Sequence, residues 1–151
     1  MLTVTPFLWF DNQAEEAMQF YATIFPNTKQ LSVTRAGDRV MMAQWEIEGQ
    51  KFMALNGGPM YKFTEAVSFF VSCETQGEID TLWQKLTADG GEPGRCGWLK
   101  DKFGLSWQIV PSQLGALMGS SDPAKSQRVG AALMSMNKLE ISGLQKAFDR
   151  A

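Results

Sequence analysis

Hydrophobic residues follow a strand period and then a helix period along the chain, and this order occurs twice. Residues 3–10 read as a strand, residues 12–25 as a helix, and residues 30–35, 39–48 and 50–56 as three strands. After a joint at residues 56–64, rich in glycine, residues 67–73 read as a strand, 75–86 as a helix, and 92–96 and 98–110 as further strands. The pattern predicts an α+β protein made of two βαβββ modules.

Both predicted helices carry start signals and a buried stripe. Asn12 with Glu15, and Thr75 with Glu78, have the spacing of a capping box. The stripes have apolar residues at i, i+3, i+4 and i+7 spacing. They comprise Ala14, Ala17, Met18, Tyr21, Ile24 and Phe25 in the first helix, and Ile79, Leu82, Trp83 and Leu86 in the second.

The stretch from Trp98 to Val110 predicts a hairpin. Asp101 and Gly104 occupy the first and fourth positions of a type I turn, where they are favoured. The charges around this turn, at residues 100–102, are expected at an exposed tip. The following strand alternates and therefore has two different faces, with Leu105, Trp107 and Ile109 on one and Ser106, Gln108 and Val110 on the other.

Beyond Val110 the pattern becomes helical only, with Asp122-Pro123 placed as an N-cap and a proline at the first helical position. The predicted organisation is a duplicated core at residues 1–110, with module one at 1–58 and module two at 65–110, and a C-terminal helical extension at 111–151. The apolar stripes of the extension are expected to pack on the core or on a second subunit. Together with open sheet edges, they predict a homodimer.

The duplication also predicts which residues share a face. An offset of 62 places Phe7 on Phe69 and Thr5 on Val67, and a match of the last strands pairs Met53 with Gln108. A single apolar face with few polar groups is therefore expected. Its predicted members are Thr5, Phe7, Trp9, Met53, Val67, Phe69, Val71 and Gln108.

Composition narrows the classes of partner. The chain has 151 residues, 44% of them apolar, and a formal charge of -2, so it lacks the basic surface that nucleic acid requires. No apolar run approaches the roughly 18 residues of a membrane span, and the N-terminus lacks the features of a signal peptide. We expect a cytoplasmic protein without nucleic-acid or membrane partners.

The inventory of reactive side chains is short. The sequence contains no histidine, which excludes Ser-His and Cys-His nucleophile systems and histidine-zinc sites. Cys73 and Cys96 fit no zinc or redox spacing and are expected as buried thiols. Cys96 is alternatively a nucleophile if Arg95 or Lys100 stabilises its thiolate. Glu46 is a candidate acid or base, or else a solvated edge residue.

Four segments carry a resemblance to a known family: TPFLWFDNQAEEAMQFY, FMALNGGP, AVSFFVSCE and CGWLKDKFGLSWQIVP. They are similar to the PhnB-like branch of the glyoxalase/bleomycin resistance/dioxygenase, or vicinal oxygen chelate, superfamily. Members of this branch also carry the label 3-demethylubiquinone 3-methyltransferase-like. The resemblance covers almost the whole chain and implies that the two modules form a cupped mixed sheet.

The resemblance also implies where a metal would bind. In metal-using members, His and Glu ligands come from the first and last strand of each module, and these positions correspond here to Thr5, Met53, Val67 and Gln108. Their hydroxyl, thioether, isopropyl and amide groups do not suit zinc or a hard divalent cation. We therefore expect neither a metal nor another cofactor. No glycine-rich nucleotide loop follows the first strand in support of the methyltransferase label.

These observations predict a metal-independent protein that binds an apolar or aromatic small molecule in the cup. The expected ligand-binding residues are Thr5, Phe7, Trp9, Met53, Val67, Phe69 and Gln108. The buried amide of Gln108 must either bond with Thr5 and backbone or receive the ligand. One alternative is an enzyme of lyase, isomerase or oxygenase type that uses Glu46, Gln108 or Cys96. A structural homodimer with a filled cup is another.

Overall fold

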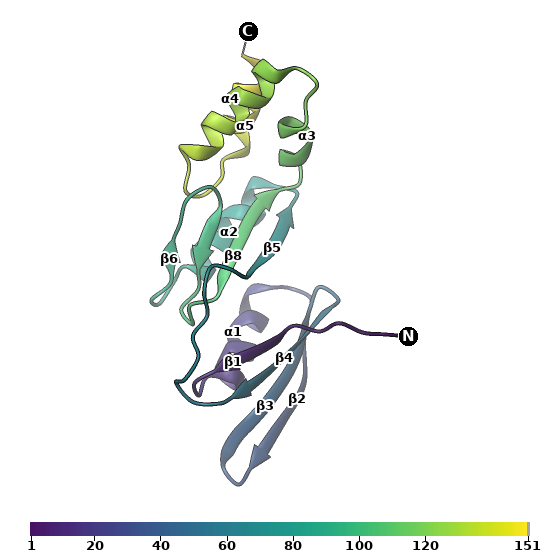
Figure 1. The fold of residues 1–151 in the computed structure, drawn as a ribbon, viewed down its shortest axis with the longest axis vertical. Coiled ribbons are helices and arrows are strands. Elements are labelled where there is room, and N and C mark those ends of the chain that lie inside the picture. Colours follow the sequence, from purple (N-terminus) through teal and green to yellow (C-terminus); the bar gives the residue numbers. More distant parts are fainter. Residues whose placement is uncertain (151) are drawn as a thin grey trace. The chain divides into compact units, whose positions relative to one another are not determined.

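The computed structural model describes residues 1–150, which form two compact units, Met1–Phe63 and a second that begins at Thr64 (Figure 1). Each unit contains a four-stranded mixed sheet, with the order β1-β4-β3-β2 in the first and β5-β8-β7-β6 in the second. In both sheets the first strand of the module lies parallel to the last. The predicted α+β fold of two βαβββ modules is confirmed.

The elements of the first unit are β1 (Phe7–Phe10), α1 (Ala14–Ile24), β2 (Thr28–Ala36), β3 (Arg39–Ile47) and β4 (Gln50–Asn56). The second unit begins with β5 (Ser68–Cys73), α2 (Gln76–Leu86), β6 (Glu92–Pro93), β7 (Trp98–Lys100) and β8 (Ser106–Pro111). It ends with α3 (Leu114–Met118), α4 (Pro123–Met134) and α5 (Ile141–Asp149). None of the helices within residues 1–150 is long and apolar enough to cross a membrane.

Helix α1 packs on one face of the first sheet through aromatic side chains. Tyr21 contacts Trp45 of β3 with ring centroids 6.0 Å apart, and Trp45 stacks on Phe52 of β4 at 6.1 Å. All six predicted stripe residues of α1 are buried. The helical period of the sequence therefore identified this side of the core.

The start of α1 differs from the prediction. Gln13 is the N-cap and makes no side-chain cap bond, so the expected capping box of Asn12 and Glu15 is wrong. Instead the side-chain oxygen of Asn56, at the end of β4, accepts a hydrogen bond from the Ala14 N–H at 2.9 Å. An acceptor from a distant strand satisfies the helix terminus in place of a local one.

Helix α2 begins as predicted. The Thr75 hydroxyl accepts from the Glu78 N–H at 3.2 Å, and the Glu78 carboxylate accepts from the Thr75 N–H at 3.0 Å. This reciprocal pair confirms the capping box. Ile79, Leu82 and Leu86 form the buried side of the helix.

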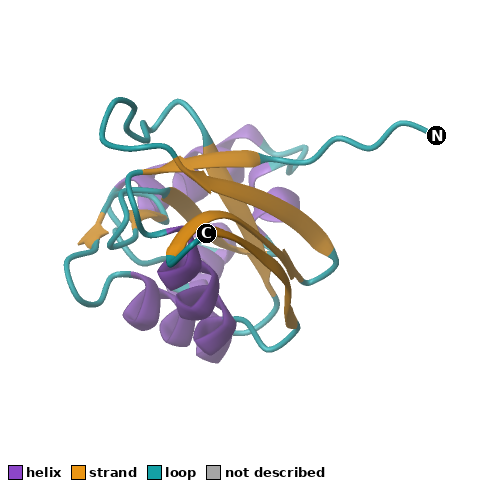
Figure 2. Cartoon of the chain, turned by 90° about the horizontal axis from the view of Figure 1, so that it is seen from below, coloured by secondary structure: helices purple, strands orange, loops and turns teal. Residues whose placement is uncertain are grey.

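Three predicted strands are shorter in the structure. β1 begins at Phe7, and Figure 2 draws the N-terminal segment before the first strand as a loop, so the expected strand residues Thr3 to Pro6 lie outside β1. Proline has no N–H for a ladder, and Pro6 contributes only its carbonyl, which accepts from the Met53 N–H at 3.0 Å. Val67 likewise precedes β5. β6 stops at Pro93 because residues 94–97 form a turn with positive φ at Cys96 and Gly97.

The hairpin at residues 98–110 contains the predicted turn but not the predicted exposure of Asp101. The Gly104 N–H donates to the Asp101 carbonyl at 2.9 Å, and Gly104 has a φ of 88°, which glycine tolerates. Asp101 is only 2% exposed. Its carboxylate accepts from the N–H of Phe103 at 2.9 Å, the N–H of Leu105 at 3.1 Å and the indole N–H of Trp107 at 2.9 Å. Asp101 is therefore an internal anchor of the hairpin, and the expectation of an exposed turn-tip charge is wrong.

The C-terminal arm folds against the second module, near the end of β8 (Figure 1). Asp122 caps α4 as predicted, accepting from the Ala124 N–H at 3.0 Å. The N–H groups of Cys96 and Gly97 donate to the carbonyls of Met136 and Asn137, each at 2.8 Å. Val110 of β8 shares a buried core with residues of the arm: Leu117, Val129, Leu139 and Leu144. The homodimer remains a prediction.

Candidate functional site

The pairing register decides which residues share a face of the second sheet. Phe70 lies beside Gln108, and Gln108 lies beside Trp98. Neighbours in register point to the same side, and successive residues alternate. We call this side the open face of the second sheet, defined by Ser68, Phe70, Trp98, Lys100, Ser106 and Gln108. The other side carries Phe69, Leu99, Trp107 and Ile109, and α2 packs against it.

The predicted face is therefore wrong for the second module. Phe69 lies beside Trp107 with ring centroids 5.2 Å apart, on the opposite side from Gln108. Val67 precedes the strand and is 67% exposed. Phe7 lies beside Met53 in the first sheet, and Phe70 lies beside the matching residue, Gln108, in the second. Phe7 therefore corresponds to Phe70, and the first strands of the two modules are 63 residues apart rather than 62. A shift of one residue moves every side chain to the other face.

Ser68 is the functional candidate that sequence reasoning missed. At an offset of 63 it matches Thr5, so both modules carry a hydroxyl at this position. The side-chain amide of Gln108 donates to the Ser68 Oγ at 2.9 Å. Thr5, the partner considered for Gln108, lies in the other unit before β1. The shared hydroxyl was the signal available in the sequence.

In the first module, the predicted residues Phe7, Trp9 and Met53 do share a face. Phe7 and Gln44 both lie beside Met53, and Trp9 lies beside Leu55. Phe7 is 48% exposed. The row Phe7-Met53-Gln44 thus crosses three strands, as the row Phe70-Gln108-Trp98 does in the second sheet.

Trp9 is engaged by the loop that follows β4. Its indole N–H donates to the Gly58 carbonyl at 2.9 Å, and its ring meets Tyr61 edge-on at 4.9 Å. A Cβ atom at Gly57 would lie 2.3 Å from the ring. The loop therefore covers part of Trp9, and Phe7 is the exposed member of this face.

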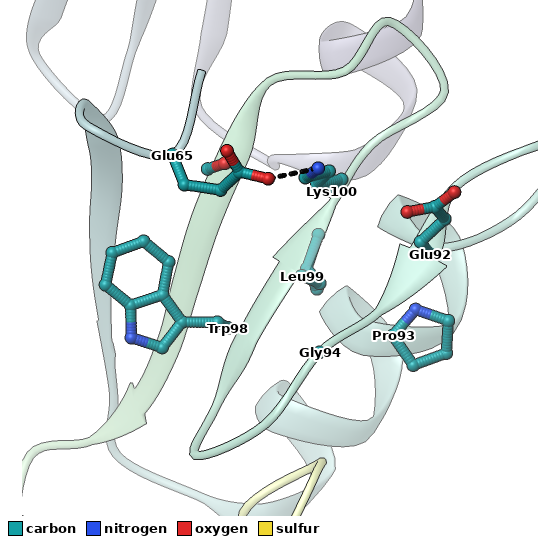
Figure 3. A pocket seen from close by; sticks show the side chains of 8 residues that line it. Glu65, Glu92, Pro93, Gly94, Trp98, Leu99 and Lys100 are labelled. Atoms are coloured by element: carbon teal, nitrogen blue, oxygen red, sulfur yellow. Dashed lines mark ion pairs between the residues drawn. The ribbon is translucent and has the colours of Figure 1, made fainter. Parts of the chain in front are cut away.

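A pocket of about 200 Å³ lies at the β6–β7 side of the second sheet (Figure 3). Its lining consists of Glu65, Glu92, Pro93, Gly94, Trp98, Leu99, Lys100 and Ser106. In Figure 3, Glu92 and Pro93 lie along one edge of β7, on the neighbouring strand β6, and the side chains of Glu65 and Trp98 lie towards the other edge. We call it the β6–β7 pocket.

An ion pair joins two of the lining residues, the Glu65 carboxylate and the Lys100 ammonium. The hydrogen bond from Lys100 lowers the pKa of Glu65, and the same bond raises the pKa of Lys100. The charge of Glu92 raises the pKa of Lys100 further. Glu65 and Lys100 consequently stay ionised at neutral pH, although exposure to solvent keeps the pair weak.

Ser106 is the first residue of β8. It belongs to the open face of the second sheet and is 1% exposed. Among residues 1–150, no side chain or backbone group forms a hydrogen bond with its Oγ. This differs from Ser68 on the same face, whose hydroxyl accepts from Gln108. A buried hydroxyl without a partner is uncommon and destabilises the fold.

A family model described as 3-demethylubiquinone-9 3-methyltransferase matches residues 2–110. The chain belongs to this family. Among solved structures, the PhnB protein from Bacillus cereus is 34% identical, in a match that covers 73% of this chain and 99% of that chain with a TM-score of 0.67. The resemblance to the PhnB-like branch is confirmed.

Two more distant structures show the fold alone. The fosfomycin resistance protein FosX from Listeria monocytogenes, complexed with manganese(II) and sulfate, is 13% identical, with 72% and 91% of the two chains covered and a TM-score of 0.55. A glyoxalase/bleomycin resistance/dioxygenase domain from Frankia sp. is 15% identical, with 74% and 92% covered and a TM-score of 0.52. This family member therefore has the vicinal oxygen chelate fold. Comparison with curated proteins gives no match.

The side chains of this family member do not fit the metal site that some members of the superfamily use. With the offset of 63, the four positions that correspond to metal ligands are Thr5, Met53, Ser68 and Gln108. They offer two hydroxyls, a thioether and an amide, and none of these is a carboxylate, imidazole or thiolate. The amide nitrogen of Gln108 already donates to Ser68. Within residues 1–150, no group of three or more His, Cys, Asp or Glu side chains is placed to hold a metal ion.

The candidate catalytic residues Cys96 and Glu46 have different surroundings, each within its own unit. The Cys96 Sγ lies 3.6 Å from the Met134 sulfur, while Arg95 donates to the Met134 carbonyl at 3.1 Å. Lys100, the other cation considered for Cys96, pairs with Glu65. Glu46 lies beside Lys29 and Lys51 on neighbouring strands of the first unit. Its surroundings are those of a charged strand residue between two lysines.

Cys73 should be the less reactive of the two free thiols. Burial, together with the nearby charge of Glu78, raises the pKa of Cys73 to about 11, whereas Cys96 is only partly buried. At pH 8, an aromatic disulfide reagent should label Cys96 in the native protein and Cys73 only after unfolding. The Cys96→Ser variant should therefore be unreactive when folded. Rapid labelling of that variant would contradict the burial of Cys73.

The same pKa shift gives a pH dependence of stability. The folded state keeps a proton on Cys73 that the unfolded chain releases above its ordinary thiol pKa, near 9.0. The contribution is fully present below pH 9 and is lost as the pH rises towards 11. Urea unfolding at pH 8 and pH 10.5 should show a larger loss for the wild type than for Cys73→Ser.

Proposed function

We propose that this protein binds apolar or aromatic small molecules without a metal ion, on the face of each sheet that its helix leaves uncovered. Membership of the superfamily supports a small-molecule-binding or enzymatic role. The proposal rests on one observation, the row Phe70-Gln108-Trp98 across β5, β8 and β7. Two aromatic side chains flank a single amide, a combination that gives a ligand contact area and one orienting polar group.

Exposure supports a binding surface rather than packing within each unit. Phe70 is 61% exposed and Phe7 is 48% exposed, although they occupy corresponding places in the two modules. Large apolar side chains at such positions are available to contact a ligand. The corresponding row Phe7-Met53-Gln44 adds an aromatic ring, a thioether and an amide. Met53 offers a deformable apolar contact of the kind found at adaptable binding surfaces.

The enzymatic alternative receives no comparable support. In the described part of the chain, Gln108 bonds with Ser68 and Cys96 lies against Met134, so neither is aligned with a proton acceptor. The FosX structure contains manganese(II). In this chain, the residues at the positions inferred for metal ligands do not suit that ion. Binding without chemistry is the function that the geometry supports best.

Phe70→Ala should weaken the binding of a neutral two-ring probe, naphthalen-2-ol, by about five- to tenfold, because an aromatic contact contributes about 1 kcal/mol. Gln108→Leu should reduce affinity by a similar factor through loss of the orienting amide. It should change the free energy of unfolding by less than about 1 kcal/mol, since Ser68 is partly exposed and can bond with water. Tryptophan fluorescence titration measures the first effect and urea unfolding the second.

The matched control is Met134→Ala, which removes an exposed apolar side chain at the end of α4. It should leave naphthalen-2-ol binding unchanged. Binding should also persist after treatment with a chelator, and elemental analysis should find no stoichiometric divalent ion. A bound divalent ion, or equal binding by wild type and Phe70→Ala, would overturn the proposed function.

A further inference from the structure

The β6–β7 pocket combines an apolar interior with a charged rim. Trp98 supplies apolar surface on the open face, and Gly94 has no side chain to fill the space beside it. A Cβ atom at Gly94 would lie 2.6 Å from the Trp98 carbonyl. The size, about 200 Å³, is below the usual range for drug-sized ligands, so the pocket suits a single ring or a short alkyl group.

Ser106 provides the polar group of this pocket. It lines the pocket, is 1% exposed, and its Oγ has no hydrogen-bond partner among residues 1–150. On the same face, by contrast, the Ser68 hydroxyl accepts a hydrogen bond from the Gln108 amide. A buried hydroxyl that the protein itself does not satisfy is a binding group for a donor or acceptor on a ligand.

The charges around the pocket select between those two kinds of ligand. Glu65 and Glu92 carry two negative charges, and Lys100 carries one positive charge, so the formal sum is -1. Lys100 and Glu65 engage each other in an ion pair, which leaves the negative charge of Glu92 as the excess charge of the rim. Trp98 adds an aromatic face, which attracts cations. A protonated amine therefore fits the pocket better than a carboxylate does.

We propose that the β6–β7 pocket binds a small primary amine with a single-ring or short alkyl body. The ammonium group donates to the Ser106 Oγ and is attracted by Glu65 and Glu92, while the body of the ligand packs on Trp98. This inference rests on the proposed function and deepens it, since Trp98 belongs both to the pocket and to the row on the open face. It adds the charge and the size of the ligand.

The test compares three probes of similar shape: benzylamine, benzyl alcohol and benzoate. Isothermal titration at pH 7 and low salt should show benzylamine binding at least tenfold more tightly than the other two. Two-dimensional amide and indole NMR should place its shifts at Trp98, Lys100 and Ser106. Equal or tighter binding of benzoate, or benzylamine shifts confined to other residues, would overturn the proposal.

Ser106→Ala tests the hydroxyl directly. It should weaken benzylamine binding by about tenfold and leave the melting temperature unchanged or raised, because it removes an unsatisfied buried group. Ser112→Ala, at an exposed serine just after β8, is the matched control and should change neither quantity. A lower melting temperature for Ser106→Ala would show that the hydroxyl has a structural partner, and would overturn the assignment.

Naphthalen-2-ol distinguishes this inference from the proposed function. If the wild type binds naphthalen-2-ol in a Phe70-dependent way but shows no preference for benzylamine, the amine pocket is wrong and the binding function stands. If naphthalen-2-ol fails while benzylamine shifts Trp98 and Ser106, the pocket stands and the aromatic row is wrong as a binding surface.

Discussion

Asp101→Ala should lower the free energy of unfolding of the second unit by about 3–5 kcal/mol, the larger of two strong effects expected in this protein. The buried carboxylate accepts from two backbone N–H groups and the Trp107 indole. Its loss removes the acceptor of two buried donors, the Leu105 N–H and the Trp107 indole, and of the partly buried Phe103 N–H. Urea unfolding followed by far-ultraviolet circular dichroism measures the change.

Two further variants identify the cause. Asp101→Asn keeps an oxygen for the N–H groups of Phe103 and Leu105 but turns an amide NH₂ towards the Trp107 indole. The free energy of unfolding of this variant should therefore lie between those of the wild type and Asp101→Ala. Asp38→Ala removes an exposed carboxylate at the β2–β3 turn and should change stability by less than about 0.5 kcal/mol. A loss below about 1 kcal/mol for Asp101→Ala would contradict the anchoring role.

Gly97→Ala should destabilise the second unit by about 2–4 kcal/mol, because strain and steric overlap act together. Gly97 has a φ of 86°, and a Cβ atom there would lie 2.9 Å from the Ile109 carbonyl oxygen and 3.0 Å from the Leu139 Cδ1. Its N–H donates to Asn137, and its carbonyl accepts from Ile109. Gly97 therefore joins β8 to the C-terminal arm, and hydrogen exchange in α4 and α5 should accelerate with the loss of stability.

Gly104→Ala separates the two causes. Its φ is 88°, but a Cβ atom there would meet nothing within 4 Å beyond its own chain neighbours, so only the backbone strain of about 1 kcal/mol applies. Hydrogen exchange in the arm should not change in this variant. If both substitutions cost the same and neither affects the arm, the close contact at Gly97 does not hold the arm in place.

Local signals in the sequence predicted much of the fold. The stripe of α1, the capping box of α2 and the Asp122 cap of α4 all depend on residues within a few positions of one another. These features follow from helical periodicity and from the orphan N–H groups at a helix start. The cap of α1 failed because its acceptor, Asn56, is 42 residues away from Ala14.

The candidate site was less accessible to sequence reasoning. Matching apolar residues between the modules gave an offset of 62, but many apolar residues match by chance, and an error of one residue exchanges the faces of a strand. The offset of 62 places Phe69 where Phe70 lies and leaves Ser68 out of the predicted face. The Asp101 side chain looked like a surface charge because the sequence does not reveal that the Trp107 indole approaches it.

The sequence by itself determined the order of elements, the duplication, the helical arm and the lack of histidine, since each is a property of residue type and local spacing. Only the tertiary structure decided the register of β5 on β8, the burial of Asp101 and the lack of a hydrogen-bond partner for the Ser106 hydroxyl among residues 1–150. These three depend on which distant strands meet and on what each side chain then touches. The hydrophobic pattern indicates that one face of a strand is covered, whereas the pairing between strands determines which residues lie on that face.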